Sequence, residues 1–111
     1  MRPKLTDRPI RDVESFGVTK PDDAAFLEGR LTPHPLATFS TPLKLANPAG
    51  NGLPARYITC TDPPYLPAKV ALERARARGW PVSDIKAGHD AMVIAPQATA
   101  DLLEKLASEE P

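Results

Sequence analysis

The chain has 111 residues, with 14 Lys plus Arg against 14 Asp plus Glu, and 14 prolines. This length allows one small domain with a modest core. A formal net charge of +0 without any basic run argues against a protein that binds nucleic acid along its phosphates. One cysteine and two histidines provide no zinc ligand set, so we expect no metal and no other cofactor.

Cysteine content and hydropathy bear on where the protein acts. Cys60 is the only cysteine, so the chain cannot form an internal disulfide. The start carries no signal-peptide pattern, and no apolar stretch approaches the roughly 18 residues of a transmembrane helix. We therefore expect a soluble, cytoplasmic protein with no membrane partner.

The N-terminal part of the chain shows little regular patterning. Residues 1–18 have neither a helical nor a strand period and are expected to form coil or an extended arm. Thr19 and Asp22 have the spacing of a capping box, which predicts a short helix that ends near Leu31.

Residues 32–54 form a proline-rich connection. They contain five prolines and two glycines, and the pattern favours at most one short extended piece at Pro42–Leu45. A connection of this length is uncommon inside a compact domain and is typical of lids, linkers or parts of a larger fold.

The second half of the chain alternates strand and helix patterns. The sequence predicts a strand over residues 57–61, a helix over 67–78, a strand over 82–86, a loop over 89–95 and a helix over 96–107. Two strands joined by a helix of this length normally lie parallel, through a right-handed crossover. Their carboxyl ends then share one edge of the sheet, which is where α/β proteins bind ligands.

Two residues at that edge have catalytic potential. Asp62 directly follows the first strand, and His89 lies just past the second. A carboxylate beside an imidazole holds its tautomer and stabilises the imidazolium formed when the ring takes a proton. The alternatives are that Asp62 is a turn residue before two prolines and that His89 is an ordinary loop residue.

Other polar and aromatic residues receive structural interpretations. Cys60 is interpreted as a small buried strand residue rather than a nucleophile, because no activating turn surrounds it. Asp90, adjacent to His89, is assigned a loop or capping role. We expect His34 on a loop that faces solvent or substrate, and Trp80 packed against the end of the preceding helix.

Three segments have a recognisable arrangement: RLTPHPLATFSTPLKL, ARYITCTDPPYLP and AGHDAMVIAPQATADLLEKLA. In this order they resemble the lid end, the acid strand and the histidine segment of α/β-hydrolases, especially the methylesterase and hydroxynitrile-lyase-like branch. The resemblance covers about residues 10–107. It implies that Asp62 is the triad acid and His89 the general base.

The same resemblance implies a partial α/β-hydrolase fold. Residues 55–111 would form two parallel strands with a crossover and a C-terminal helix. Residues 1–54 would be a lid-derived arm, a short helix and the proline-rich connection.

The chain departs from the family at the nucleophile. Complete α/β-hydrolases carry a serine in a G-x-S-x-G turn, and the oxyanion hole uses N–H groups from that turn and from an early loop. The chain has no G-x-S-x-G. We therefore expect a truncated hydrolase-like protein that is inactive alone and hydrolyses a small-molecule ester only when an N-terminal part complements it.

Two other interpretations remain open. The chain is either a small non-catalytic interaction or dimerisation protein that reuses the hydrolase unit, or part of a reading frame that starts upstream. Buried parallel strands need cover on both faces and a neighbour at their edge. We therefore expect marginal stability, self-association or dependence on the missing N-terminal half.

Overall fold

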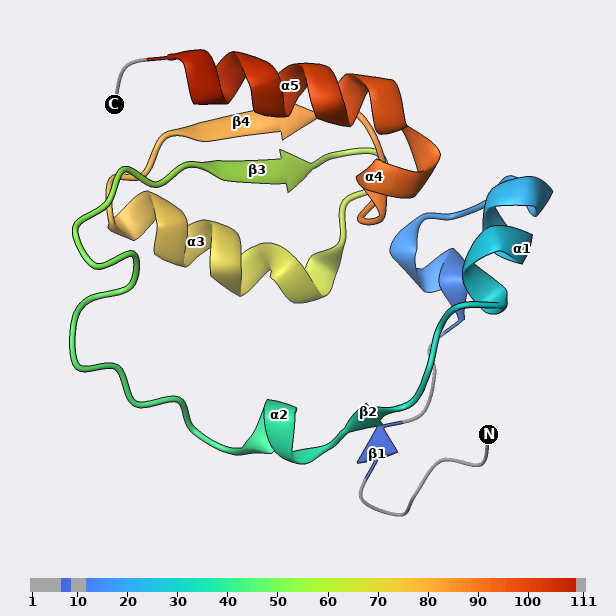
Figure 1. The fold of residues 1–111 in the computed structure, drawn as a ribbon, viewed down its shortest axis with the longest axis horizontal. Helices are drawn as coiled ribbons and strands as arrows, with labels where there is room; N and C mark the ends of the chain where they lie inside the picture. Colours follow the sequence, from blue (N-terminus) through green and yellow to red (C-terminus); the bar gives the residue numbers. More distant parts are fainter. Residues whose placement is uncertain (1–6, 9–11, 110–111) are drawn as a thin grey trace.

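The structure is a computed structural model that describes residues 7–8 and 12–109 (Figure 1). Predictions that concern residues 1–6, 9–11 and 110–111 lie outside the described residues. The C-terminal half contains the larger sheet and its helices: β3 (Tyr57–Cys60), η2 (Leu66–Ala68), α3 (Lys69–Ala77), β4 (Val82–Ile85), α4 (Ala91–Ile94) and α5 (Pro96–Ser108). The N-terminal half contains β1 (Asp7–Arg8), η1 (Val13–Phe16), α1 (Pro21–Glu28), β2 (His34–Pro35) and α2 (Ala37–Ser40).

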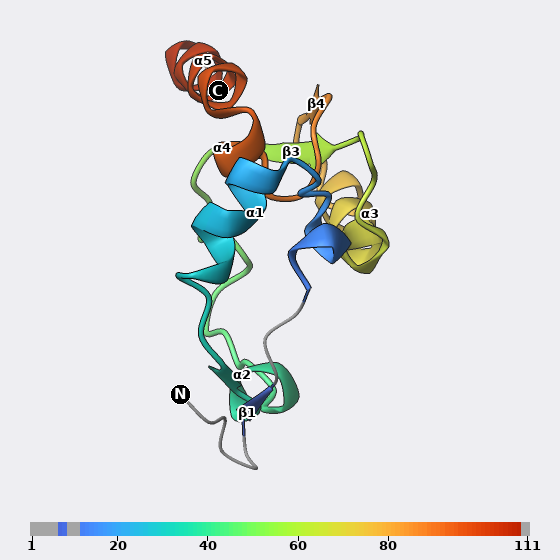
Figure 2. The same ribbon diagram turned by 90° about the vertical axis from the view of Figure 1, so that its right-hand side faces the viewer.

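Strands β3 and β4 form a two-stranded parallel sheet, in which Tyr57 lies opposite Val82 and Cys60 opposite Ile85. The β-branched and aromatic residues of β3 suit a pleated, half-buried strand. Helix α3 connects the two strands, and α5 follows them. Figures 1 and 2 show that α3 and α5 lie on opposite faces of the sheet. The predicted α/β class and the parallel pairing are therefore confirmed.

The core consists of two small clusters. In the first, Ile85, Ala87 and Ala91 are buried, with β3 and α5 side chains packed against them. In the second, Val13, Val18 and Leu27 are buried beneath η1 and α1. Helix α4 joins the clusters, because Ile94 packs against both of them. The N-terminal segment is thereby attached to the carboxyl edge of the sheet.

Two local predictions for the N-terminal half are wrong. Residues 13–16 form the 3-10 helix η1 rather than coil, because the Asp12 side chain accepts the Glu14 N–H at 3.1 Å and caps it. Helix α1 begins after Lys20 without a side-chain cap, so the capping box is wrong. The residue before Pro21 is extended, as steric contact with a proline ring requires, and the helix starts at the proline itself.

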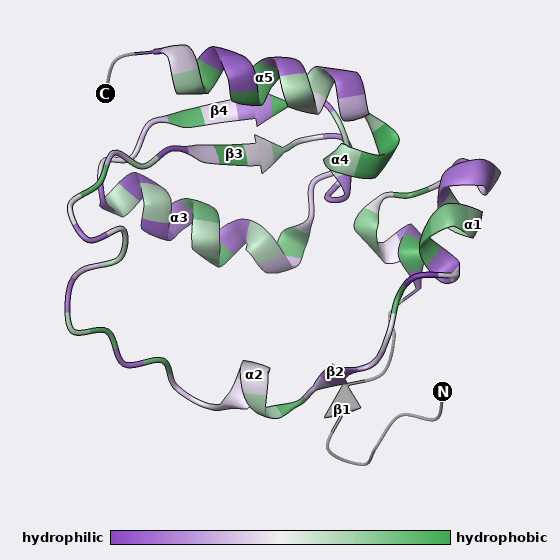
Figure 3. Ribbon diagram, viewed as in Figure 1, coloured by the Kyte–Doolittle hydropathy of each residue, from purple (hydrophilic) through white to green (hydrophobic). Residues whose placement is uncertain are grey.

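The connection contains more local structure than expected in one part and less in another. Strand β2 pairs with β1, and α2 forms a single turn directly after it. By contrast, Pro42–Leu45, predicted as a short extended piece, forms neither a helix nor a paired strand within the described part of the chain. Residues 41–54, here called the strap, run outside the sheet and carry exposed leucines (Figure 3).

Residues 91–94 form the helical turn α4, within the segment predicted to be a loop. Within residues 7–8 and 12–109, no helix has the length and apolar character needed to cross a membrane.

Candidate functional site

The loops that follow β3 and β4 are joined by backbone hydrogen bonds. The Thr61 N–H donates to the Ile85 carbonyl at 3.0 Å, and the Asp62 N–H donates to the Ala87 carbonyl at 3.2 Å. The Thr61 hydroxyl donates to the same Ile85 carbonyl at 3.2 Å. Because parallel strands end at one edge, these bonds place the segments carrying Asp62 and His89 side by side.

Asp62 lies on the exposed side of this edge. It lines a shallow depression together with Lys20 and Lys86. It also occupies a tight turn, since Thr61 and Pro64 form an isolated antiparallel bridge around it. Its interpretation as a turn residue therefore agrees with the structure, and its carboxylate remains accessible.

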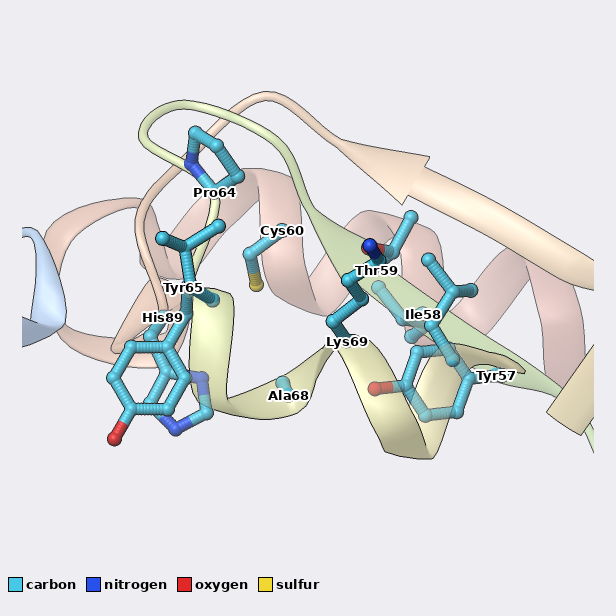
Figure 4. A pocket seen from close by; sticks show the side chains of 11 residues that line it. Tyr57, Ile58, Thr59, Cys60, Pro64, Tyr65, Ala68, Lys69 and His89 are labelled. Atoms are coloured by element: carbon cyan, nitrogen blue, oxygen red, sulfur yellow. The ribbon is translucent and has the colours of Figure 1, made fainter. Parts of the chain in front are cut away.

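His89 lies on a different side of the edge and is half-buried. Its ring stacks on that of Tyr65, with centroids 4.0 Å apart and an interplanar angle of 14°. The Phe16 ring lies 5.9 Å from it on a tilt. Both His89 and Tyr65 line a pocket of about 380 Å³ between β3 and α3 (Figure 4). The imidazole is thus held by aromatic contacts.

The structure brings the two loops together but does not pair the two side chains. Neither a hydrogen bond nor an ion pair joins Asp62 to His89 within the described part of the chain, and each residue lines a different pocket. In this arrangement no hydrogen bond to a carboxylate of the described residues selects the tautomer of the imidazole.

A close approach of two glycines supports the His89 loop. A Cβ atom on Gly17 would lie 2.9 Å from the Gly88 Cα, and one on Gly88 would lie 3.0 Å from the Phe16 carbonyl oxygen. Gly17 also has a φ of 83°, in the left-handed region. The turn after η1 therefore packs directly on the backbone before His89. The sequence indicates neither this contact nor the role of Tyr65, because neither leaves a local pattern in the sequence.

Cys60 lies at the end of β3 and is half-buried, whereas the sequence predicts a buried strand residue. It packs against the buried cluster of Ile85, Ala87 and Ala91, but among the described residues no second strand lies beside β3 to complete its cover. Figure 4 shows the thiol directed into the pocket that His89 lines. Burial, with a smaller contribution from the Asp90 carboxylate, raises the pKa of the Cys60 thiol.

This shift predicts a slow thiol. Since the thiolate is the reactive form, a raised pKa lowers its fraction at neutral pH. We expect iodoacetamide to alkylate Cys60 more slowly in the folded chain than in urea, with a rate that rises as the pH increases. Asp90→Asn removes a negative charge and should accelerate alkylation, but by less than unfolding does, because burial is the larger cause. Asp84→Asn, at an exposed position on β4, serves as the control. Equal rates for the Asp90 and Asp84 variants would contradict the assignment.

The remaining candidates have structural environments. His34 is exposed and meets the Phe39 ring edge-on at 5.4 Å between centroids. The Trp80 N–H donates to the Ala75 carbonyl at 3.0 Å and so closes the end of α3, while the Arg78 guanidinium lies 5.5 Å from the centre of the Trp80 ring. Asp90 occupies the N-cap position of α4 without a side-chain cap bond. Among the residues that the structure describes, no three His, Cys, Asp or Glu side chains gather as metal ligands.

The fold and the site define a small α/β unit with an imidazole, a carboxylate and a thiol near one sheet edge. Comparison with protein-family models, with curated proteins and with solved structures finds no significant match to the chain.

Proposed function

We propose that this chain is the acid- and base-bearing part of an α/β-hydrolase, which hydrolyses a small-molecule ester when an N-terminal part supplies the serine nucleophile. The observation that supports the proposal is the bonded pair of loops after β3 and β4, with Asp62 on one and His89 on the other. A triad requires its acid within hydrogen-bond reach of its base, and adjacent loops permit that approach. We also propose a cytoplasmic location, since a chain with one cysteine needs no oxidising compartment.

In the complemented state, each residue has a defined role. The serine oxygen attacks the ester carbonyl while His89 accepts its proton, and His89 then gives that proton to the departing alkoxide. Asp62 receives a hydrogen bond from the other ring nitrogen and stabilises the imidazolium. Water then attacks the acyl group, with His89 again acting as the base. The oxyanion hole belongs to the N-terminal part.

Assembly of this site brings the Asp62 carboxylate within hydrogen-bond distance of the His89 ring, which is stacked on Tyr65 in the structure. Asp62 is exposed and its side chain forms no ion pair with Lys20 or Lys86, so little opposes its rotation. The stacked arrangement is therefore the resting form of an unassembled triad.

The proposal is tested by complementation. The chain is co-expressed with the N-terminal part of a methylesterase-like α/β-hydrolase that ends before its lid, and the complex is assayed with p-nitrophenyl acetate. We expect turnover that falls by about a millionfold in His89→Ala and by about ten-thousandfold in Asp62→Asn. His34→Ala and Asp84→Asn, at exposed positions, should leave it unchanged.

Two results would overturn the proposal. The first is turnover by the isolated chain that His89→Ala abolishes, because the chain would then have its own nucleophile. The second is a stable complex whose activity is indifferent to both triad variants. Reading the DNA upstream of Met1 for an in-frame G-x-S-x-G gives an independent check on the source of the N-terminal part.

A further inference from the structure

We propose that two copies of this chain associate through the free edge of β3, which pairs antiparallel with itself about Ile58. The product is a continuous sheet in the order β4, β3, β3, β4. The inference does not rest on the hydrolase proposal, because it uses neither Asp62 nor His89. The two compete for one edge, since an N-terminal half that supplied the missing neighbour would pair with the same edge of β3.

The backbone groups of β3 point alternately towards β4 and towards the opposite edge of the strand. The Tyr57 N–H donates to Pro81 at 2.9 Å and the Thr61 N–H to Ile85 at 3.0 Å, both towards β4. Successive residues of a strand direct their backbone groups to opposite edges. The N–H and C=O groups of Ile58 and Cys60 therefore point away from β4, where they meet no partner among the described residues.

Leucine side chains lie on both sides of this edge, with Lys69 beside them on the α3 side and the Arg56–Glu109 ion pair beside them on the α5 side. On the α3 side, Leu66 and Leu72 line the pocket of about 380 Å³ beside β3. On the α5 side, Leu103 and Leu106 line a second pocket, of about 460 Å³, with Ile58. Leu66 is 75% exposed and Leu103 is 53% exposed. Apolar surface that extends past a strand on both faces is typical of a sheet interior, not of its rim.

Strand β3 itself lacks the residues that usually prevent pairing at a sheet edge, which also favours pairing there. Natural edge strands are commonly blunted by a lysine, a proline or an inward-pointing charge. Strand β3 has the sequence Tyr-Ile-Thr-Cys, which includes none of these. Because β3 is short, only a few residues of each copy can pair. Contacts between the α3 and α5 helices of the two copies must therefore supply much of the association free energy.

A second copy of the chain can pair with this edge of β3. When β3 is placed antiparallel to itself about Ile58, Tyr57 faces Thr59 and Arg56 faces Cys60. Every outward N–H then meets an outward C=O, and no like charges lie opposite each other. The Arg56 guanidinium is already 3.0 Å from the Glu109 carboxylate of its own chain. The formal net charge of +0 means that two copies do not repel.

The association is tested by sedimentation equilibrium over a dilution series. We expect a monomer–dimer equilibrium in the wild-type chain. Leu66→Lys and Leu103→Lys place a charge on either side of the paired edge, and each should weaken the dimer about tenfold or more. Met92→Lys is the matched control, because Met92 is 60% exposed and lines neither pocket. Circular dichroism confirms that each variant is folded.

The register is tested by disulfide formation in a Cys60→Ser background. Tyr57 and Thr59 of the two copies form a non-hydrogen-bonded pair in this register, with Cα atoms about 4.5 Å apart. A mixture of the Tyr57→Cys chain and the Thr59→Cys chain should therefore form a mixed disulfide far faster than either chain alone.

Defined results would overturn the inference. One is a wild-type chain that stays monomeric at every concentration, and another is equal weakening by Met92→Lys and the two edge variants. Equal cross-linking by the single chains and the mixture would exclude the proposed register. Asp62→Asn should dimerise like the wild type, so that failure of the hydrolase proposal and failure of this one give different results.

Discussion

Alanine at Gly17 is expected to destabilise the chain by about 3 kcal/mol, which combines a left-handed backbone with a steric overlap. The φ of 83° costs any L residue free energy, and the new Cβ would lie 2.9 Å from the Gly88 Cα. Backbone atoms cannot move aside as a flexible side chain can, so η1 and the His89 loop must separate. Urea unfolding at a fixed protein concentration measures the change in the free energy of unfolding.

Two other glycines separate these causes. Gly52 has a φ of 76° with no atom within 4 Å of its Cβ position, so Gly52→Ala carries the backbone cost alone, about 1 kcal/mol. Gly88 has no positive φ, but its Cβ would lie 3.0 Å from both the Gly17 Cα and the Phe16 carbonyl oxygen. Gly88→Ala therefore carries the steric cost alone. If Gly17→Ala and Gly52→Ala destabilise the chain equally, the packed contact is absent.

Truncation of Ile85 to alanine is the second substitution with a large expected effect, a loss of about 3 kcal/mol. Ile85 is 7% exposed and lies at the end of β4, in the cluster with Ala87 and Ala91. Both of those neighbours are small, so they cannot expand to fill the cavity that alanine leaves. Since small domains have little net stability, a large fraction of the Ile85→Ala molecules should be unfolded.

A graded series checks this value. Ile85→Val removes one methylene and should cost about 1 kcal/mol. Met92→Ala truncates a side chain that is 60% exposed, and should change the free energy of unfolding by about 0.5 kcal/mol or less. Urea unfolding at one protein concentration measures all three variants, because self-association would otherwise shift the midpoint. An Ile85→Ala chain as stable as Met92→Ala would show that this cluster is not a core.

The sequence by itself predicted the C-terminal unit, because its signals are local. The β-branched run before Asp62, the helix formers after Pro67 and the proline at residue 96 each act within one element. Parallel pairing of β3 and β4 then follows from the length of the crossover helix. The same topology predicted that the segments carrying Asp62 and His89 share an edge, as their backbone hydrogen bonds demonstrate.

Tertiary structure alone decided how the side chains at that edge are arranged. The stack of His89 on Tyr65, the separation of His89 from Asp62 and the contact of Gly17 with Gly88 join residues that are distant in the sequence. No period or cap encodes such contacts, because they depend on packing between η1, the β3 turn and the loop before α4. The strap shows the converse: Pro42–Leu45 has a strand-like pattern, but a strand forms only where a neighbour accepts its hydrogen bonds.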